Sequence, residues 1–435
     1  MSSTNGEPVT LERILDRENL GRAYRQVVAN KGAPGVDGMK VSELADYCRA
    51  HPNEISQAVL NGKYRPKPIR RKYIPKDNGD RRPLGIPTVT DRLVQQATAQ
   101  VLSDFYEPYF SDNSFGFRPG RGCRQAIERA TEYANSGRPW VIDLDLAKFF
   151  DTVNHSKLLQ VLSERIKDGR VISLIHRFLR APVSEDGKVG PKTTMGTPQG
   201  GSISPVLANI LLNELDQLLD SRGIKFVRYA DDLVAFCGSR KAAERVLGNI
   251  KKFVEKKLFL KVNETKTKIV HVSDDVQFLG FTFTQRVSEE RKRRSLRWKW
   301  FPSVHPKKRT KLHAVLKTLL DRRAPGGIGK AKRQLRLKLR GWCAYFGESI
   351  PRTWMRDTDQ WIRRRIRQIY WKQWKTPKAR HRAMKRLWKD APEREDYAYS
   401  VNSYWRMSNT RIIHQALCNR VLEKEGWVWI GTFAT

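Results

Sequence analysis

The 435-residue sequence lacks the features of disulfide-stabilised, zinc-binding and membrane-spanning proteins. Its five cysteines lie far apart, without a C-x-x-C pair or a histidine at zinc-ligand spacing, so neither a disulfide framework nor a zinc module is expected. No stretch approaches the roughly 18 uninterrupted apolar residues of a transmembrane helix. The N-terminus also has no basic segment followed by an apolar one. These absences predict a soluble intracellular protein with no membrane partner.

Acidic residues are also scarce, since 45 Asp and Glu stand against 83 Lys and Arg, a formal net charge of +38. A folded protein with this much charge of one sign needs a polyanion to neutralise it, and nucleic acid is the expected partner. A membrane surface is the alternative, but the twelve tryptophans lie on helices with the pattern of packed helices rather than in one amphipathic stripe.

The positive charge is concentrated in one region, because residues 286–389 hold 34 Lys and Arg against 6 Asp and Glu. Before this region, short strand-like runs alternate with helical patterns, which indicates an α+β fold. Within it, the pattern is almost entirely helical. Three helices are predicted, each with an apolar face that we expect in the core rather than stacked on bases: Leu312, Val315, Leu316, Leu319 and Leu320; Ala331, Leu335, Leu339, Trp342 and Phe346; and Trp361, Ile362, Ile366, Ile369, Tyr370 and Trp374.

Carboxylates follow two strand-like runs of the first region. The strand VIDLDL, from residue 141, puts Asp143 and Asp145 on the face opposite its isoleucine and leucines. Asp231 and Asp232 occupy the turn of FVRYADDLVAF. Two strand-end carboxylates brought side by side repel each other unless a divalent cation lies between them. Mg²⁺ suits such a site, and two such ions can catalyse nucleotidyl transfer. The alternative is that these aspartates are ordinary turn and capping residues.

Two other segments have the composition of a nucleotide site. Residues 195–219 begin with Gly200 and Gly201, which permit close backbone approach, and Ser204 before a proline predicts the N-cap of an apolar helix. Residues 71–97 predict a basic strand and turn that lead into a helix, where basic side chains can grip a triphosphate. The alternatives are an ordinary loop-to-helix junction and a solvated basic hairpin.

In this order the stretches resemble the reverse transcriptase family: the segment ending in RPLGIP, the strand DLAKFFD, the PQG loop, the YADD hairpin, LKVNETKTKI and FLGF. Within that family the chain is similar to group II intron-encoded proteins, through GAPGVDG, FGFRPGRG, PQGGSISPVLANILL, RGWCAYF and WIRRRIRQIYWKQWK. The resemblance covers nearly the whole chain.

The resemblance implies a right-hand polymerase fold followed by an all-α region. Fingers and palm are expected over 1–285, with an N-terminal extension over about 1–65. The helical thumb and maturase (X) domain is expected over 286–390, and a short helical DNA-binding tail over 391–435. Paired cysteines of an HNH endonuclease are absent from this tail, which makes the chain similar to the group IIC subclass.

The resemblance also implies roles for individual residues. Asp145 and Asp231 are implied metal ligands, with the Leu146 carbonyl assisting and Asp232 coordinating more weakly. Lys266 is the implied proton donor to pyrophosphate, and Asp143 lies outside the matched motif as a supporting carboxylate. The implied substrate contacts are Lys76 and Arg82 on the triphosphate, Phe150 under the sugar and Gln199 over the nucleotide. The basic composition of the surrounding sequence predicts nucleic-acid contacts for Arg363, Arg364, Arg365, Arg367 and Lys372, and the alternative for the run 363–365 is a solvated helix face.

The expected function is therefore an RNA-directed DNA polymerase that also binds its intron RNA as a maturase and assists splicing and retrohoming. The expected partners are the group II intron RNA, an RNA template with a DNA primer, target DNA and dNTPs, with Mg²⁺ as cofactor. A bacterial cytoplasmic location, with or without nucleoid association, follows from the resemblance. The alternatives are a domesticated or defence-associated reverse transcriptase, and an RNA-binding splicing factor without polymerase activity.

Overall fold

The computed structural model describes residues 7–75, 79–198, 200–287, 298–387 and 397–434. The chain forms two compact units, Met1–Leu279 and Gly280–Thr435, which are described separately. Two predicted substrate contacts, Lys76 and Gln199, lie outside the described residues.

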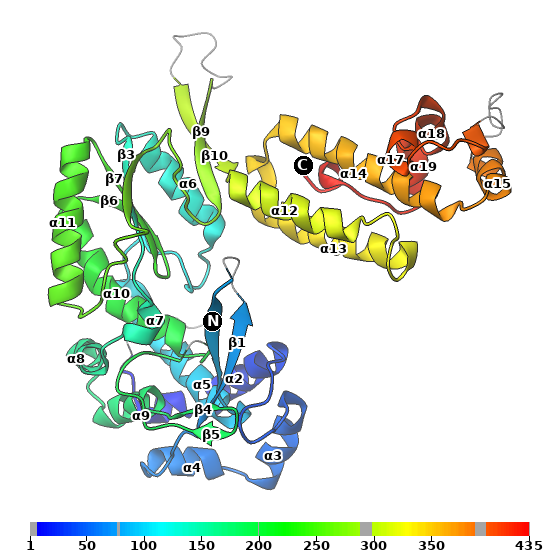
Figure 1. The fold of residues 1–435 in the computed structure, drawn as a ribbon. Coiled ribbons are helices and arrows are strands. Elements are labelled where there is room, and N and C mark those ends of the chain that lie inside the picture. The colour runs from blue at the N-terminus through cyan, green and yellow to red at the C-terminus, as the bar shows by residue number, and fades with distance from the viewer. Residues whose placement is uncertain (1–6, 76–78, 199, 288–297, 388–396, 435) are drawn as a thin grey trace. The chain divides into compact units, whose positions relative to one another are not determined.

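The first unit begins with helices and a small mixed sheet (Figure 1). The predicted basic strand and turn form β1 and β2, which pair antiparallel, and the helix that they lead into is α5. β1 also pairs in parallel with β4, so that the sheet order is β2-β1-β4-β5. The elements of this part are α1 (Leu11–Ile14), α2 (Arg17–Ala29), η1 (Val41–Glu43), α3 (Leu44–Ala50), α4 (Glu54–Leu60), β1 (Ile69–Pro75), β2 (Arg81–Ile86), α5 (Val89–Tyr106), η2 (Glu107–Tyr109), β4 (Val183–Glu185) and β5 (Lys188–Val189).

The second sheet of this unit has the order β6-β7-β3-β8, with neighbouring strands antiparallel. Its register places Ile142 opposite Ala235 and Leu144 opposite Leu233. All four side chains belong to the main core, so the predicted apolar face of the strand from residue 141 is confirmed. The elements are α6 (Cys123–Ala134), β3 (Trp140–Leu144), α7 (Phe149–Thr152), α8 (His155–Arg165), α9 (Gly169–Leu179), α10 (Ser204–Ser221), β6 (Lys225–Tyr229), β7 (Asp232–Cys237), α11 (Arg240–Lys256) and β8 (Lys268–His271).

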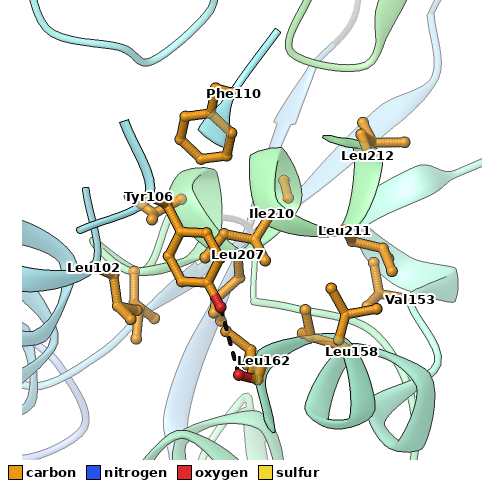
Figure 2. Close-up of a cluster of buried hydrophobic side chains, with 14 of the residues drawn as sticks. Leu102, Tyr106, Phe110, Val153, Leu158, Leu162, Leu207, Ile210, Leu211 and Leu212 are labelled. Carbon is orange, nitrogen blue, oxygen red and sulfur yellow. Dashed lines mark hydrogen bonds between the residues drawn. The ribbon is translucent and has the colours of Figure 1, made fainter. Parts of the chain in front are cut away.

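The core of the first unit lies where α5, α8 and α10 pack together. Figure 2 shows Leu102 and Tyr106 of α5 facing Leu207 and Ile210 of α10. The Tyr106 hydroxyl donates to the Leu162 carbonyl oxygen at 3.5 Å, which satisfies its polar end inside this apolar cluster. The apolar residues of α10 surround its axis, and this distribution is typical of a helix buried on all sides.

The predicted N-cap of α10 is wrong by one residue. Ser204 is the first helical residue, Ile203 takes the capping position, and the Ser204 hydroxyl donates instead to the Pro198 carbonyl oxygen at 2.8 Å. This bond ties the loop before α10 to the start of the helix. A serine at a helix start can hydrogen-bond to a nearby backbone carbonyl as well as to a backbone amide of the first turn.

The second unit is an antiparallel β9–β10 pair followed by helices. The three helices predicted from periodicity are confirmed as α12, α13 and α14, and the side chains of Leu316, Leu335 and Ile366 are fully buried. The elements are β9 (Phe281–Val287), β10 (Trp298–Val304), α12 (Pro306–Leu319), α13 (Gly327–Phe346), η4 (Gly347–Ser349), α14 (Arg352–Gln373), α15 (Pro377–Leu387), α17 (Tyr404–Met407), α18 (Arg411–Ala416), α19 (Asn419–Lys424) and η5 (Ile430–Thr432).

The end of the chain folds back onto α14. Asp359 of that helix accepts hydrogen bonds from the Ile430 and Gly431 backbone amides at 2.7 and 2.9 Å, and the Trp427 indole donates to the Tyr370 hydroxyl at 3.1 Å. The C-terminal segment is therefore anchored by buried polar contacts as well as by the buried side chains of Trp427 and Ile430. The domain boundaries predicted from charge and resemblance stay a proposal.

The cysteines and the helices agree with the composition of the chain. All five cysteines are free thiols, as predicted from their spacing. Within the described ranges, no helix has the length and apolarity needed to cross a membrane.

Candidate active site

Four aspartates lie together on the sheet face that points away from the main core. Leu144 pairs with Leu233 and Tyr229 pairs with Asp232. Asp145, one residue beyond Leu144, therefore lies across from Asp232 at the start of β7. Asp231 occupies the two-residue turn between β6 and β7, and Asp143 shares the β3 face of Asp145 by alternation. We call Asp143, Asp145, Asp231 and Asp232 the acidic cluster.

The pKa values of three of these carboxyl groups are raised. Burial, and then the negative charges of Asp231, Asp143 and Asp145, raise the pKa of Asp232 to about 6. Burial also raises the pKa of Asp143 to about 6, against the lowering effect of Lys268. The pKa of Asp231 is raised for the same first reason, and Asp145 adds to it. The charged forms of Asp143, Asp231 and Asp232 are thus disfavoured by their surroundings.

Two predicted cationic residues lie beside this cluster. Lys266 Nζ is 3.4 Å from Asp145 Oδ1, and the turn that carries it is held by a hydrogen bond from the Asn263 amide to the Asp145 carbonyl oxygen at 2.8 Å. The positive charge of Arg82, at the exposed end of the β1–β2 hairpin, acts to lower the pKa of Asp231. One cation thus lies beside Asp145, and the charge of the other acts on Asp231.

The donor atoms of the cluster fit a divalent cation. Carboxylate oxygens are the ligands that hard divalent ions prefer, and the burial and mutual repulsion that raise three carboxyl pKa values are offset when a cation lies among them. Among the described residues, no group of three or more His, Cys, Asp or Glu side chains is arranged to enclose an ion by itself.

A cavity of about 270 Å³ is lined by Phe150, the loop before α10, and the sheet that contains the β1–β2 hairpin. Phe150 lies at its edge, and its carbonyl oxygen accepts a hydrogen bond from the Thr197 amide at 2.6 Å. Gly196 has a φ of +85° and its Cβ position lies 2.9 Å from the Asp151 carbonyl oxygen, so only glycine fits this close approach. The lining residues are Ile69, Arg71, Pro83, Gly85, Phe150, Asp151, Ala181, Val183, Thr193, Met195, Gly196, Thr197 and Pro198.

The predicted close approach of the glycines after this loop is confirmed. A Cβ atom on Gly200 would lie 2.4 Å from the Gly85 carbonyl oxygen, and one on Gly201 would lie 2.8 Å from Gln95 Oε1. The loop therefore packs directly on β2 and on α5, which holds the cavity wall against the β1–β2 hairpin.

Arg71 is a cavity residue that the sequence analysis missed. It lies on β1 two residues from buried Ile69, and both line the cavity. Its Nε is buried without a hydrogen-bond partner among the described residues. The signal that could have identified it is the strand alternation of β1, which puts residues 69 and 71 on one face.

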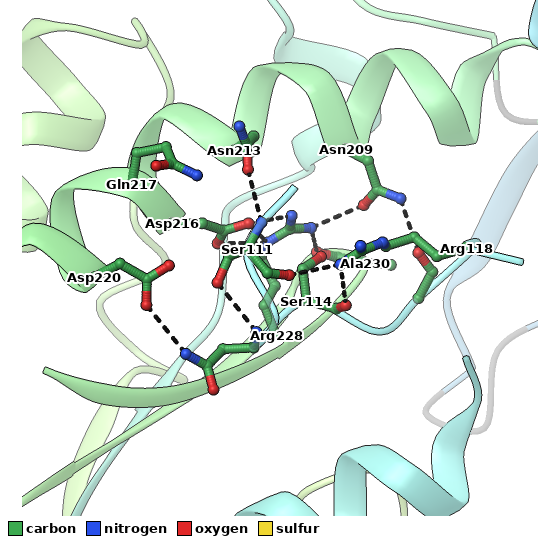
Figure 3. Close-up of polar contacts among 12 residues, drawn as sticks. Ser111, Ser114, Arg118, Asn209, Asn213, Asp216, Gln217, Asp220, Arg228 and Ala230 are labelled. Atoms are coloured by element: carbon green, nitrogen blue, oxygen red, sulfur yellow. Dashed lines mark hydrogen bonds and ion pairs between the residues drawn. The ribbon is translucent and has the colours of Figure 1, made fainter. Parts of the chain in front are cut away.

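The hairpin that carries Asp231 is fixed from its core side by a buried ion pair (Figure 3). Arg228 is 1 % exposed and its Nε donates to Asp216 Oδ1 of α10 at 2.8 Å. Arg228 Nη1 donates to Asn209 Oδ1 and to the Ala230 carbonyl oxygen, both at 2.9 Å. Since Ala230 immediately precedes Asp231, these bonds hold the turn in place.

A second contact presses on the same turn. Ala230 has a φ of +57°, which is uncommon for a residue with a side chain. A Cβ atom on Gly116 would lie 2.4 Å from the Ala230 nitrogen, so the FGFRPGRG segment packs its glycine against the hairpin. The Gly116 carbonyl oxygen accepts from Asn209 Nδ2 at 2.8 Å, which links this segment to the buried network around Arg228.

The basic residues predicted to contact nucleic acid lie on α14, and they are buried or half-buried rather than fully solvated. Arg364 Nη2 donates to the Trp405 carbonyl oxygen at 3.1 Å, and Arg365 Nη2 donates to the Lys317 carbonyl oxygen at 3.3 Å. Lys372 Nζ donates to the Tyr404 hydroxyl at 3.3 Å. Arg367 is 4 % exposed, and Arg363 lies over the Trp429 ring at 5.1 Å from its centroid.

Residues 74–283 match the family described as reverse transcriptase (RNA-dependent DNA polymerase), and residues 307–388 match the group II intron maturase-specific domain. Protein YkfC of Escherichia coli (strain K12) is 34% identical over 318 residues, which cover 64% of this chain and 83% of that protein. Group II intron-encoded protein LtrA of Lactococcus lactis subsp. cremoris is 31% identical over 336 residues, 62% of this chain and 56% of LtrA. The chain thus spans only about half the length of that second relative.

A solved structure described as a partial Cas6-RT-Cas1--Cas2 complex has 21% sequence identity and a TM-score of 0.35, and covers 56% of this chain and 42% of that one. At this score the similarity supports no inference.

Proposed function

This chain belongs to the reverse transcriptases encoded by group II introns, and on that premise we propose that it copies RNA into DNA and also binds its intron RNA as a maturase that assists splicing and retrohoming. The observation that carries the polymerase half is the acidic cluster, four carboxyl groups gathered from β3 and the residue after it and from the β6–β7 turn and the start of β7. The maturase half is supported by the domain match over 307–388 and by the basic composition of the second unit.

The proposed reaction joins a primer to an incoming dNTP. The primer 3′-oxygen forms a bond to the α-phosphorus, and the bond from that phosphorus to the bridging oxygen of pyrophosphate breaks. Asp145 and Asp231, with the Leu146 carbonyl and weaker help from Asp232, would hold Mg²⁺. When bound there, the ion makes the 3′-hydroxyl more acidic and stabilises charge on the departing pyrophosphate.

Other residues position the substrate and transfer a proton. Lys266, 3.4 Å from Asp145, donates a proton to the leaving pyrophosphate. Lys76 and Arg82 contact the triphosphate as charge-assisted donors. Phe150 lies under the sugar and excludes a 2′-hydroxyl, and Gln199 lies over the nucleotide. Asp143 lies on the same strand face as Asp145. It adds a negative charge beside Asp145 without binding the ion directly.

Primer extension on an RNA template tests the polymerase half. We expect the purified chain to extend a DNA primer with dNTPs when Mg²⁺ is present and to stop when a chelator removes it. Extension that continues in excess chelator, or none under any divalent ion, would contradict the assignment.

The maturase half has a separate test, which measures self-splicing of a group II intron RNA at low Mg²⁺ with and without the protein. We expect faster splicing with the protein, and a protein that leaves the rate unchanged for its own intron would lack this function. The location of the reading frame inside an intron would identify that RNA.

A further inference from the structure

The second unit contains a cavity of about 480 Å³ between α14 and the helices that follow it. One wall comes from α14, whose positions 360, 363, 364 and 367 recur on one helical face. The other wall comes from α17, α18 and the residues beside them. The lining residues are Asp357, Gln360, Trp361, Arg363, Arg364, Arg367, Trp405, Asn409, His414 and Asn419. We call this space the arginine cavity.

Among the residues that line this cavity, positive charges outnumber negative ones. Three guanidinium groups line it, and the one carboxylate among the lining residues is Asp357, whose Oδ1 lies 3.6 Å from Arg356 Nε, outside the lining set. Like charges at this density repel one another. A cavity with this charge therefore favours an anionic occupant.

Arg367 shows the imbalance most clearly. It is 4 % exposed, its Nε donates to the Leu417 carbonyl oxygen at 3.0 Å, and its Nη1 lies 3.3 Å from His414 Nε2. Within the described part of the chain, no carboxylate forms an ion pair with it. Burial, and then the charge of Arg363, lower the pKa of Arg367 to about 10. An unpaired buried cation is costly, and the cost falls when an anion binds beside it.

The neighbouring arginines offer donors. Arg364 lies over the Trp405 ring at 3.7 Å from its centroid, and its Nε is buried without a hydrogen-bond partner among the described residues. Arg363 contacts the Trp429 ring, and no hydrogen bond or ion pair links it to a described residue. Guanidinium forks match phosphate oxygens closely, so these groups can bind a phosphate without giving up a structural bond.

We propose that the arginine cavity binds a phosphate group of a nucleic-acid strand, with Arg363, Arg364 and Arg367 as its donors and Asn409 and Asn419 at its edge. This inference rests on the proposed function, because RNA binding supplies the strand, and it adds a discrete pocket to a general basic surface. An acidic peptide is the other anionic polymer that fits the charge. We favour nucleic acid because α14, which forms one wall of the cavity, belongs to a stretch of sequence, residues 286–389, with 34 Lys and Arg against 6 Asp and Glu, a composition suited to a phosphate backbone.

The first experiment uses inorganic phosphate and the full chain. At constant ionic strength, phosphate in place of chloride should raise the wild-type melting temperature by about 3 °C. Arg363→Gln should lose most of this shift, and it should fold normally because Arg363 makes no hydrogen bond to the described residues. Arg336→Gln removes the same charge from the exposed face of α13 and should keep the shift. Equal shifts in all three proteins would overturn the pocket.

The second experiment distinguishes a strand from free phosphate. A short single-stranded RNA should bind Arg363→Gln roughly tenfold more weakly than wild type, and the log-log salt slope should fall by about 0.7. A morpholino of the same sequence, which lacks phosphate charges, should bind both proteins equally weakly. A poly-glutamate peptide that binds in the cavity more tightly than the RNA would assign it to a protein partner instead and overturn the proposal.

These results are independent of the polymerase assignment. Failure of primer extension with an intact phosphate shift would reject the proposed function and leave an anion pocket. Loss of the phosphate shift with normal primer extension would reject the pocket alone.

Discussion

The acidic cluster of the first unit and the arginine cavity of the second present the same electrostatic problem with opposite signs. In each, several charges of one sign lie close together, and the described residues around them supply too few charges of the opposite sign to neutralise them. The acidic cluster is partly neutralised from within, because Lys266 lies beside Asp145 and Lys268 opposes Asp143. The arginine cavity has no comparable partner for Arg367 among the described residues.

The buried ion pair of Arg228 with Asp216 is a third charged group, and it needs no ligand. Arg228 is as deeply buried as Arg367, but Asp216 meets it directly, and Asn209 and a backbone carbonyl satisfy its other donors. This contrast suggests how to separate structural from functional charge in this protein. A buried charge with its own counter-charge stabilises the fold, and a crowd of like charges without one marks a place where a ligand supplies the counter-charge.

The largest expected effect comes from breaking the acidic cluster. Asp231→Ala should reduce RNA-templated primer extension by about 10⁴-fold, or about 5 kcal/mol in the transition state, because it removes a carboxylate proposed to hold the metal ion. Binding of intron RNA, measured by filter retention, should change less than twofold. Asp274→Ala, a change of the same charge in the loop after β8, is the matched control and should extend primers normally.

Equal loss of primer extension and RNA binding in Asp231→Ala would show that the acidic cluster and the RNA-binding surface do not act separately. Normal extension by that variant would remove Asp231 from catalysis.

The next prediction tests whether the buried residues Arg228 and Arg367 have different roles. Arg228→Met should lower the free energy of unfolding by about 3 to 5 kcal/mol, because Asp216 would stay buried and charged without a partner. Urea unfolding measures this change. The control is Arg240→Met, which breaks an exposed pair with Glu244 and should cost less than about 0.5 kcal/mol.

The double variant Arg228→Met, Asp216→Leu should recover much of the lost stability, since it removes both charges together. If the double variant is no more stable than Arg228→Met, the loss comes from packing around the hairpin and not from the uncompensated carboxylate.

Much of this arrangement is predictable from the sequence, but only where a local pattern determines it. The period of two in VIDLDL predicts which face carries Asp143 and Asp145, and the period of 3.6 predicts α12, α13 and α14. Both patterns depend on residues a few positions apart, and the structure confirms them.

The ion pair of Arg228 with Asp216 and the arginine cavity are not predictable in this way. Arg228 sits in an apolar strand and Asp216 in an apolar helix, and nothing local to either shows that they meet. The run at 363–365 has the composition of a solvated helix face. Arg364 of this run contacts Trp405, and Arg367 contacts Leu417, partners about 40 to 50 residues away, and such contacts come only from tertiary packing.

A smaller effect on stability is expected for Arg367, whose described partners include no carboxylate. Arg367→Met removes a cation that is costly to bury and leaves the Leu417 carbonyl oxygen without its donor, a loss of about 1 kcal/mol. The two changes oppose each other, so the free energy of unfolding in chloride buffer should change by no more than about 1 kcal/mol. In phosphate buffer the wild type should gain stability and the variant should not. A loss as large as that of Arg228→Met would show that Arg367 is structural.

The smallest effect concerns His414, which faces the arginines of α14. Burial, and then the charges of Arg367, Arg364 and Arg363, lower the pKa of the His414 imidazole. A histidine with a lowered folded-state pKa binds fewer protons than the unfolded chain, so its contribution to stability is present above about pH 6.5 and is lost as the pH falls through the folded-state value. Because His414 is only partly buried, we expect only a few tenths of a kcal/mol, and His414→Gln should remove that part of the pH dependence. An NMR titration of the imidazole measures the same coupling directly. Bound phosphate should raise the pKa of His414, since an anion beside the three guanidinium groups offsets the positive charge that disfavours the protonated ring. An unchanged titration of His414 in saturating phosphate would mean that the anion binds elsewhere.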